Sequence, residues 1–168
     1  MDYEAVVPEV AELSEGEPSD VVLENARRKA LAGAALAEVA GDRVVLGVDT
    51  DVALDGRLLG KPHTPDEARR RLEALEGRVH EVLSGVVILG PGESERSGVA
   101  RSEVGFRALA PDDIGRYVAS GEWRDRAGGY AIQGLGSTLV ESLQGDLSNV
   151  IGLPIPLLLQ LAPELGKP

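Results

Sequence analysis

The stretch VVLGV, residues 44–48, is a strong strand signal, and it runs directly into Asp49-Thr50-Asp51. Five consecutive apolar residues bounded by turn signals are typical of a short strand buried on both faces, as in a sheet sandwiched by helices. In helix-covered sheets, ligands gather at the carboxyl ends of strands. We therefore expect an α/β fold with polar chemistry close to Asp49.

Helical and strand patterns alternate on both sides of this strand. Before and just after this strand, we expect an opening strand over Tyr3–Val7, a loop over 15–19, a helix from the Ser19 cap to about Val39 that ends at Gly41-Asp42, and a hairpin turn over 54–58. Next come a helix from the Thr64 cap to Gly77 and two strands, Val79–Leu89 and Val99–Leu109, joined by the loop Gly90–Gly98. The chain ends with a helix from Pro111 to Gly121, a strand over Ser137–Leu143 and a final helix over Leu153–Leu161. This order predicts a single α/β domain over residues 1–168. Its sheet would be mixed and twisted, flanked by helices, with a long antiparallel hairpin.

The composition narrows the partners. Lys+Arg 17 against Asp+Glu 28 gives a net charge of −11, which argues against broad binding to nucleic-acid backbones or anionic membranes. The chain shows neither a transmembrane stretch nor the pattern of a signal peptide. With Cys 0, it leans toward a reducing compartment. We expect a cytoplasmic protein without a nucleic-acid or membrane partner.

Asp49 and Asp51 are the first candidates for chemistry. If the strand continues, alternation places both on the same side. Two carboxylates this close can bind a divalent metal, and one of them can serve as a general base. The alternative is a turn in which Asp49 caps local backbone amides, and position alone does not decide between the two.

Cationic and amide side chains elsewhere in the chain can contact a phosphate or a base. Lys61 can clamp a phosphate or be a solvated surface lysine, and Lys29 lies in a helical charge run that is usually a wet face. The segment DRAGGYAIQG, residues 125–134, combines glycines that permit close backbone approach with Arg126 for phosphate and Gln133 for a base edge. Its alternative is a flexible surface loop.

Several familiar catalytic signatures are missing from the sequence. It has no Gly-x-x-x-x-Gly-Lys-Ser/Thr loop, no Gly-x-Gly-x-x-Gly, no cysteine nucleophile and no Gly-x-Ser-x-Gly elbow. P-loop ATPases, Rossmann dehydrogenases and α/β-hydrolases are therefore disfavoured.

Short segments spread over nearly the whole chain resemble, in order, the Maf (septum-formation protein) family of nucleoside triphosphate pyrophosphatases. The matching segments are ENARRKA (24–30), LGVDT (46–50), LGKP (59–62), VGFR (104–107), YVASGE (117–122), DRAGGYAIQG (125–134), VE (140–141) and NVIGLP (149–154). Each segment is weak alone, but the ordered set is highly specific. The Tyr-x-Ile-Gln-Gly form at 130–134 is similar to the subgroup that prefers dTTP and UTP.

The resemblance implies hydrolysis of the bond between the α- and β-phosphates of nucleoside triphosphates such as dTTP, UTP and modified pyrimidine nucleotides, giving a monophosphate and pyrophosphate. It makes Asp49 the general base, or the carboxylate that holds metal and water. Glu12 aligns with an acidic residue that would share in metal binding. The implied cofactor is Mg²⁺, with Mn²⁺ as the alternative, and a homodimer is the implied assembly.

The same resemblance assigns the remaining site residues. Lys29 and Lys61 align with cations that would neutralise the triphosphate, and Arg126 takes the place of a family lysine. Thr50 and Gln133 match positions linked to base choice. The set is chemically coherent, because attack of water on phosphorus needs an oriented nucleophile and cations that screen the phosphate oxygens.

Two departures from the family pattern affect these expectations. Family members open with a strand and a Ser-x-Ser-Pro-Arg-Arg loop ahead of the region that matches Tyr3, so either the start codon is assigned too late or the loop is lost. The intact downstream motifs favour the late start. A lost loop would make this a non-catalytic nucleotide-binding or cell-division-linked interaction protein. Asp51 stands where the family has an apolar residue, and it can add a metal ligand or raise the pKa of Asp49 by like-charge repulsion.

Overall fold

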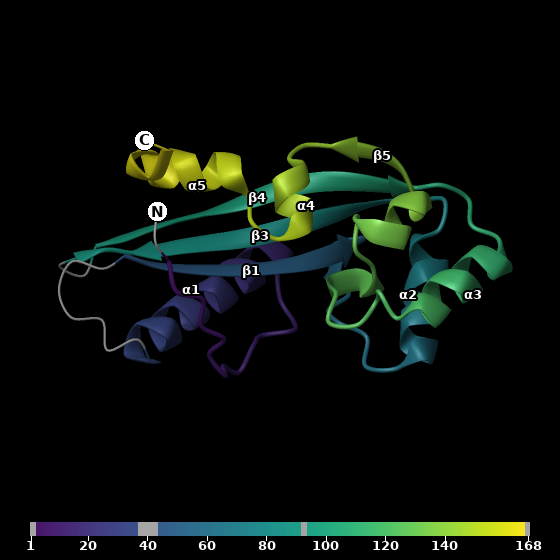
Figure 1. Ribbon diagram of the computed structural model, residues 1–168, viewed down its shortest axis with the longest axis horizontal. Helices are drawn as coiled ribbons and strands as arrows, with labels where there is room; N and C mark the ends of the chain where they lie inside the picture. The colour runs from purple at the N-terminus through teal and green to yellow at the C-terminus, as the bar shows by residue number, and fades with distance from the viewer. Residues whose placement is uncertain (1–2, 37–43, 92–93, 167–168) are drawn as a thin grey trace.

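A computed structural model describes residues 3–36, 44–91 and 94–166. In it, five strands form one sheet in the order β2-β1-β3-β4-β5 (Figure 1). The strands are β1 (Val45–Leu54), β2 (Arg57–Leu58), β3 (Val79–Leu89), β4 (Glu95–Phe106) and β5 (Val140–Gln144). The predicted α/β class and the long β3–β4 hairpin are confirmed. Neighbouring strands in this sheet are antiparallel throughout, in place of a mixture of directions.

Strand β1 extends beyond the predicted VVLGV segment and includes Asp49-Thr50-Asp51. The expectation of burial on both faces is wrong at the start of the VVLGV segment, since Val44, just before the strand, is 47% exposed and Leu46 is 40% exposed. The reason is that α5 (Ile155–Leu161) packs over β4 and β3 and leaves the outer face of β1 open there. The Asp55-Gly56 turn is confirmed: both residues are left-handed, with φ of 52° and 73°, which suits a tight hairpin.

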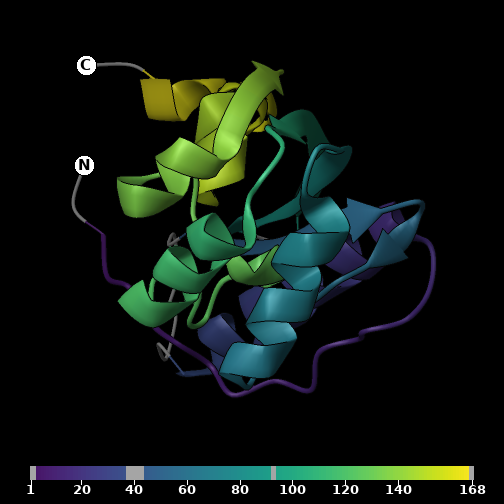
Figure 2. The same ribbon diagram turned by 90° about the vertical axis from the view of Figure 1, so that its right-hand side faces the viewer.

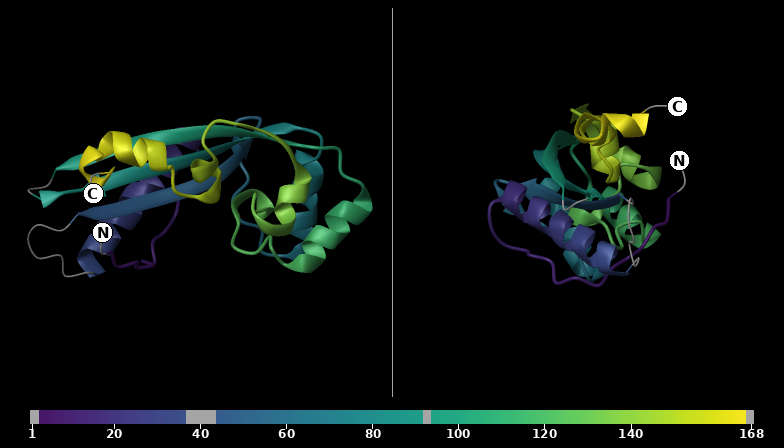
Figure 3. Two further views of the ribbon diagram at one scale, coloured as in Figure 1. Left: turned by 45° about the horizontal axis from the view of Figure 1, so that its top comes forward. Right: turned by 90° about the vertical axis from the view of Figure 1, so that its left-hand side faces the viewer.

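Helix α1 (Pro18–Leu36) begins one residue before the predicted Ser19 cap. The predicted end of this helix, at Val39 and Gly41-Asp42, lies outside the described residues. Helix α1 covers one face of β1 and β3, and Figure 3 shows the amino-terminal segment running alongside it.

Helices α2 (Pro65–Leu75) and α3 (Pro111–Ser120) begin and end as their local signals predict. The Thr64 hydroxyl caps α2 by accepting from the Glu67 N–H at 3.2 Å. The Glu67 carboxylate accepts from the His63 N–H instead of completing the capping box at Thr64. Glycines in the left-handed region follow both helices, with φ of 64° at Gly77 and 77° at Gly121.

Four other predicted boundaries need correction. Residues 3–7 form no strand, and β4 begins at Glu95, so part of the predicted Gly90–Gly98 loop belongs to the hairpin. The Ser137–Leu143 strand becomes the 3-10 turn η3 (Gly134–Leu139) followed by β5. The final helix is preceded by α4 (Leu147–Ile151) and starts only at Ile155. Gly152, with a φ of 119°, and Pro154 interrupt the helical path between them.

The molecule is elongated, with α2 and α3 packed at one end of the sheet (Figures 1 and 2). The largest apolar cluster lies there and joins both helices to β1, β3 and β4. Its centre includes an edge-to-face group in which the Phe106 ring lies 4.8 Å from that of Tyr130 and 5.0 Å from that of His80. Asp49 lies on β1 within the part of the sheet that α1 covers, and its β3 partner Gly85 packs closely against the backbone of α1.

Candidate active site

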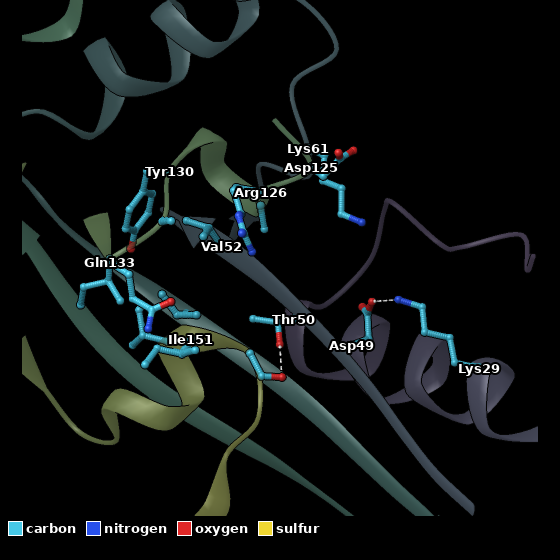
Figure 4. A pocket seen from close by; sticks show the side chains of 16 residues that line it. Lys29, Asp49, Thr50, Val52, Lys61, Asp125, Arg126, Tyr130, Gln133 and Ile151 are labelled. Carbon is cyan, nitrogen blue, oxygen red and sulfur yellow. Dashed lines mark hydrogen bonds and ion pairs between the residues drawn. The ribbon is translucent and has the colours of Figure 1, made fainter. Parts of the chain in front are cut away.

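Asp49 lies at the centre of the site, on the face of β1 that meets α1. Its Oδ1 is 2.5 Å from Lys29 Nζ (Figure 4). Its Oδ2 accepts from Asn25 Nδ2 at 3.3 Å. Close packing produces this meeting: a Cβ at Gly47 would lie 2.2 Å from the Ala26 carbonyl oxygen, so only glycine lets α1 approach β1 here. Lys29, one turn further along α1, is thereby carried to Asp49.

Glu12 reaches the same lysine from the amino-terminal segment. Its Oε1 lies 2.7 Å from Lys29 Nζ. Two mutual hydrogen bonds hold the segment on α1: the Leu13 N–H donates to Asn25 Oδ1 at 2.8 Å, and Asn25 Nδ2 donates to the Leu13 carbonyl at 3.0 Å. Arg28 donates to another backbone carbonyl of the segment at 2.8 Å. The buried Asn25 therefore joins the segment that carries Glu12 to Asp49.

The charges of these three groups stabilise one another. Burial would lower the pKa of Lys29, but its hydrogen bonds to Asp49 and Glu12 hold the pKa above its usual value. Burial would raise the pKa of Glu12, but its hydrogen bond and proximity to Lys29 hold that pKa low. The site thus contains a cation between two carboxylates.

A cavity of about 260 Å³ opens beside Asp49. Six of the seven predicted site residues line it, namely Lys29, Asp49, Thr50, Lys61, Arg126 and Gln133. A second cavity of about 330 Å³ adjoins it, includes Glu12, and shares Asp49, Thr50 and Lys61 with the first. The sequence left open whether Lys29, Lys61 and the 125–134 segment bind a ligand or are separate surface features. The structure brings all three to the same cavity.

Thr50 points to the opposite face of β1, as strand alternation requires. Its hydroxyl is 2.7 Å from the hydroxyl of the buried Ser84 on β3 and 3.5 Å from the Gly152 carbonyl. Below it, the buried Asn149 of α4 donates to the Val82 carbonyl at 2.9 Å. These bonds fasten the segment after α4 to the sheet, so that it forms one wall of the first cavity.

Arg126 and Gln133 come from one glycine-rich segment on the other side of the cavity. Figure 4 shows both side chains reaching toward the space above Thr50, with Lys61 on the neighbouring loop. Both side chains are exposed. The segment carries the 3-10 turn η2 (Ala127–Gly129), in which Gly128 is left-handed with a φ of 66°. It is anchored to the rest of the fold, since the Gly128 N–H donates to the Gly60 carbonyl at 2.8 Å.

Asp51 lines the second cavity together with Asp49, as alternation predicted. Its Oδ1 accepts from the N–H groups of Val52, at 2.7 Å, and Gly60, at 3.0 Å. Burial raises the pKa of Asp51 to about 6, with a smaller contribution from the charge of Asp49. Repulsion between the two carboxylates is thus one of the causes that raise the pKa of Asp51.

Four residues of the site have a role that the sequence did not indicate, namely Asn25, Arg71, Ser84 and Asn149. Asn25 is a polar residue on the otherwise apolar face of a helix, which is a signal that could have been noticed. The other three act through partners more than ten residues distant in sequence, and no local pattern marks them.

The residues present fit a Mg²⁺ ion only if substrate and water complete its coordination. Glu12 and Asp49 supply two carboxylates at one place, and Mg²⁺ is commonly held by one or two carboxylates plus substrate phosphates. In the described part of the chain, no three acidic or histidine side chains gather as a self-sufficient metal site.

The fold and this cavity define an α/β protein with a carboxylate on strand β1, cations around it and an amide on the opposite wall. The family model described as Maf-like protein matches residues 1–165, and the chain belongs to the Maf family. None of the described helices has the length and apolar character needed to cross a membrane.

Three relatives illustrate the similarity. A dTTP/UTP pyrophosphatase from Bacillus cereus (strain B4264) is 45% identical over 155 residues, which cover 91% of this chain and 79% of that protein. A dTTP/UTP pyrophosphatase from Dictyoglomus thermophilum is 41% identical over 170 residues, covering 99% of this chain and 86% of that protein. One from Pyrococcus furiosus is 41% identical over 154 residues, covering 92% and 78%.

Proposed function

We propose that the protein hydrolyses nucleoside triphosphates, dTTP and UTP first among them, to a nucleoside monophosphate and pyrophosphate. The observation that carries this proposal is the shared cavity in which the Asp49–Lys29 pair faces Lys61, Arg126 and Gln133. The names of the relatives supply the substrates.

The chemistry follows from the placement of these groups. A water oxygen bonds to the α-phosphorus, the bond from that phosphorus to the bridging oxygen breaks, and pyrophosphate leaves. Asp49 accepts a proton from the attacking water, and its hydrogen bonds to Lys29 and Asn25 fix the direction of the carboxylate. Lys61 and Arg126 screen the phosphate oxygens as charge moves onto the leaving group.

Base choice is assigned to the wall opposite Asp49. The Gln133 amide offers an acceptor and two donors, which can pair with the N3–H and a carbonyl oxygen of uracil or thymine. Thr50 stands beside it, where its hydroxyl is already bonded to Ser84. We assign Gln133 the reading of the base and Thr50 the support of the adjoining wall.

Mg²⁺, or Mn²⁺ in its place, is the proposed cofactor, held by Glu12 and Asp49. When bound, it would neutralise charge on the phosphate oxygens. The two carboxylates would supply its protein ligands and orient water beside it. We also place the protein in the cytoplasm, where its substrates are made, and a homodimer stays a proposal.

The test is a product assay with dTTP, UTP, CTP and GTP in the presence of Mg²⁺. Wild-type protein is expected to release pyrophosphate, not orthophosphate, and in ¹⁸O-labelled water the label should enter the monophosphate. Asp49→Asn should lower kcat by about 10²-fold or more, as loss of a general base does. The control Asp20→Asn removes an exposed carboxylate in the first turn of α1 and should leave turnover unchanged.

Two results would contradict the proposal. Nucleotide binding without any pyrophosphate release would favour the binding-protein alternative. Wild-type turnover by Asp49→Asn would show that another group accepts the proton.

A further inference from the structure

The residue Gly60, which precedes Lys61, is held from three sides. Its N–H donates to Asp51 Oδ1 at 3.0 Å. Its carbonyl accepts from the Gly128 N–H at 2.8 Å and also from the Arg71 guanidinium on α2. Both peptide units that flank Gly60 are therefore fixed.

Two of these partners are charged residues that the proposed chemistry does not use. Asp51 and Arg71 are both half-buried. Placing ionisable groups in a poorly solvated position costs stability unless they gain good hydrogen bonds. Here both side chains bond to the backbone of Gly60, and Asp51 also accepts from the Val52 N–H.

Because Gly60 directly precedes Lys61, the bonds to Gly60 also restrict the backbone of Lys61. The Gly60 carbonyl belongs to the same peptide plane as the N–H of Lys61, so fixing the carbonyl fixes the start of the lysine. Lys61 is exposed and borders both cavities, so its long side chain would otherwise sample many directions. Gly60 also bonds to Gly128, two residues after Arg126, and so the second phosphate-facing cation shares the same anchor.

We propose that Asp51 and Arg71 are positioning residues that clamp Gly60 and thereby hold Lys61 and Arg126 ready for the phosphates of a nucleoside triphosphate. The proposal rests on the proposed function for its ligand. In this proposal Arg71 does not contact the ligand itself; it acts by positioning Lys61 and Arg126. Preorganising a cation improves affinity by avoiding the entropy lost on ordering it.

The readout is the affinity for a UTP analogue in which a methylene replaces the oxygen between the α- and β-phosphates, measured by calorimetry with Mg²⁺. Arg71→Met keeps the apolar stem and removes the donor, and we expect affinity to fall about 5- to 20-fold, the loss expected of one hydrogen bond. The matched control is Arg70→Met on the same helix, whose side chain is exposed, and it should leave affinity within 2-fold of wild type.

A double-mutant cycle separates positioning from general structure. If Arg71 acts through the two positioned cations, Arg71→Met should change affinity less than 2-fold in a background that lacks both, Lys61→Met/Arg126→Met. Asp51→Asn keeps the Oδ1 acceptor and should resemble wild type, whereas Asp51→Val should behave like Arg71→Met. Because the cycle can be run with either Asp51→Val or Arg71→Met, a folding failure of one variant leaves the other to decide.

If the loss from Arg71→Met adds in full to that of Lys61→Met/Arg126→Met, the clamp is overturned, since Arg71 would then have a direct contact or a purely structural role. An unchanged affinity in both Arg71→Met and Asp51→Val would overturn it as well. The binding readout does not depend on turnover. A wild-type protein that fails to hydrolyse UTP but shows the non-additive pattern would refute the pyrophosphatase proposal and leave the clamp standing, and the reverse pattern would refute only the clamp.

Discussion

The buried His80 makes the fold sensitive to acid in a way that can be measured. It is 2% exposed on β3, its Nε2 lies 2.7 Å from the Tyr130 hydroxyl, and its Nδ1 has no partner among the described residues. Burial lowers the pKa of His80 from 6.5 to about 4. Because the unfolded chain binds this proton more readily than the folded chain, stability is complete above pH 6.5 and falls as the pH drops toward 4.

The size of the effect follows from those two pKa values. Linkage gives a loss of about 2 kcal/mol between pH 7 and pH 5 from this side chain alone, and about 3 kcal/mol in total below pH 4. The variant His80→Gln keeps a neutral polar group near Tyr130 and does not titrate. Wild-type protein should therefore lose about 2 kcal/mol more than His80→Gln over this interval, whatever the other groups contribute.

The assay is denaturant unfolding at pH 7 and pH 5, followed by the fluorescence of the single tryptophan, Trp123, which is 3% exposed and so reports the loss of the core. The matched control is His63→Gln, which removes the other, exposed histidine and should keep the wild-type dependence on pH. Equal losses in wild type and His80→Gln would refute the reasoning that His80 is held neutral by burial.

Two further variants test packing and base choice. Gly85→Ala should lower the free energy of unfolding by about 2–3 kcal/mol, because its Cβ would lie 2.3 Å from the Val22 carbonyl oxygen. Gly115→Ala on α3, with its nearest contact at 4.0 Å, should raise the free energy of unfolding by about 1 kcal/mol. Urea unfolding measures both, and an unchanged stability of Gly85→Ala would contradict the close packing of α1 on the sheet. Gln133→Leu should lower kcat/KM for UTP about 10-fold or more and change kcat/KM for CTP much less, because the lost hydrogen bonds are those matched to uracil. Steady-state kinetics with both nucleotides measures this difference. An equal loss for UTP and CTP would show that Gln133 does not read the base.

Local signals predicted those parts of the fold that depend on neighbouring residues in sequence. The Thr64 cap, the left-handed Gly77 and the Asp55-Gly56 turn are set by backbone chemistry within a few residues, and the structure confirms all three. The start of β4 depends instead on pairing across the sheet. Glu95 pairs with Leu89, and this ladder makes a strand from a polar, serine-containing segment that resembles a loop.

The candidate site also contains residues that the sequence predicts and one that depends on tertiary packing. Asp49 was predictable because it follows a strong strand signal, and the family resemblance placed Lys29, Lys61 and Gln133 around it. Arg71 was not predictable, since its donor reaches Gly60 only after α2 has packed beside the loop. A guanidinium in a charge run on a helix gives no indication of this in sequence.

The net charge of −11 raises the question of how this protein would attract a polyanion. Lys29 lines the first cavity, but its ammonium group already forms ion pairs with Asp49 and Glu12. Its charge is therefore largely neutralised by these carboxylates and attracts a ligand less. Lys61 and Arg126 are the exposed cations left to face the phosphates there. Long-range attraction is therefore weak, and affinity must come from short-range contacts that are already in place before the ligand arrives. That requirement gives a physical reason for placing the half-buried Asp51 and Arg71 at one glycine. Lys61 and Arg126 are the exposed cations that line this cavity in the described part of the chain, and holding both in position matters more than the stability that the partly buried charges cost.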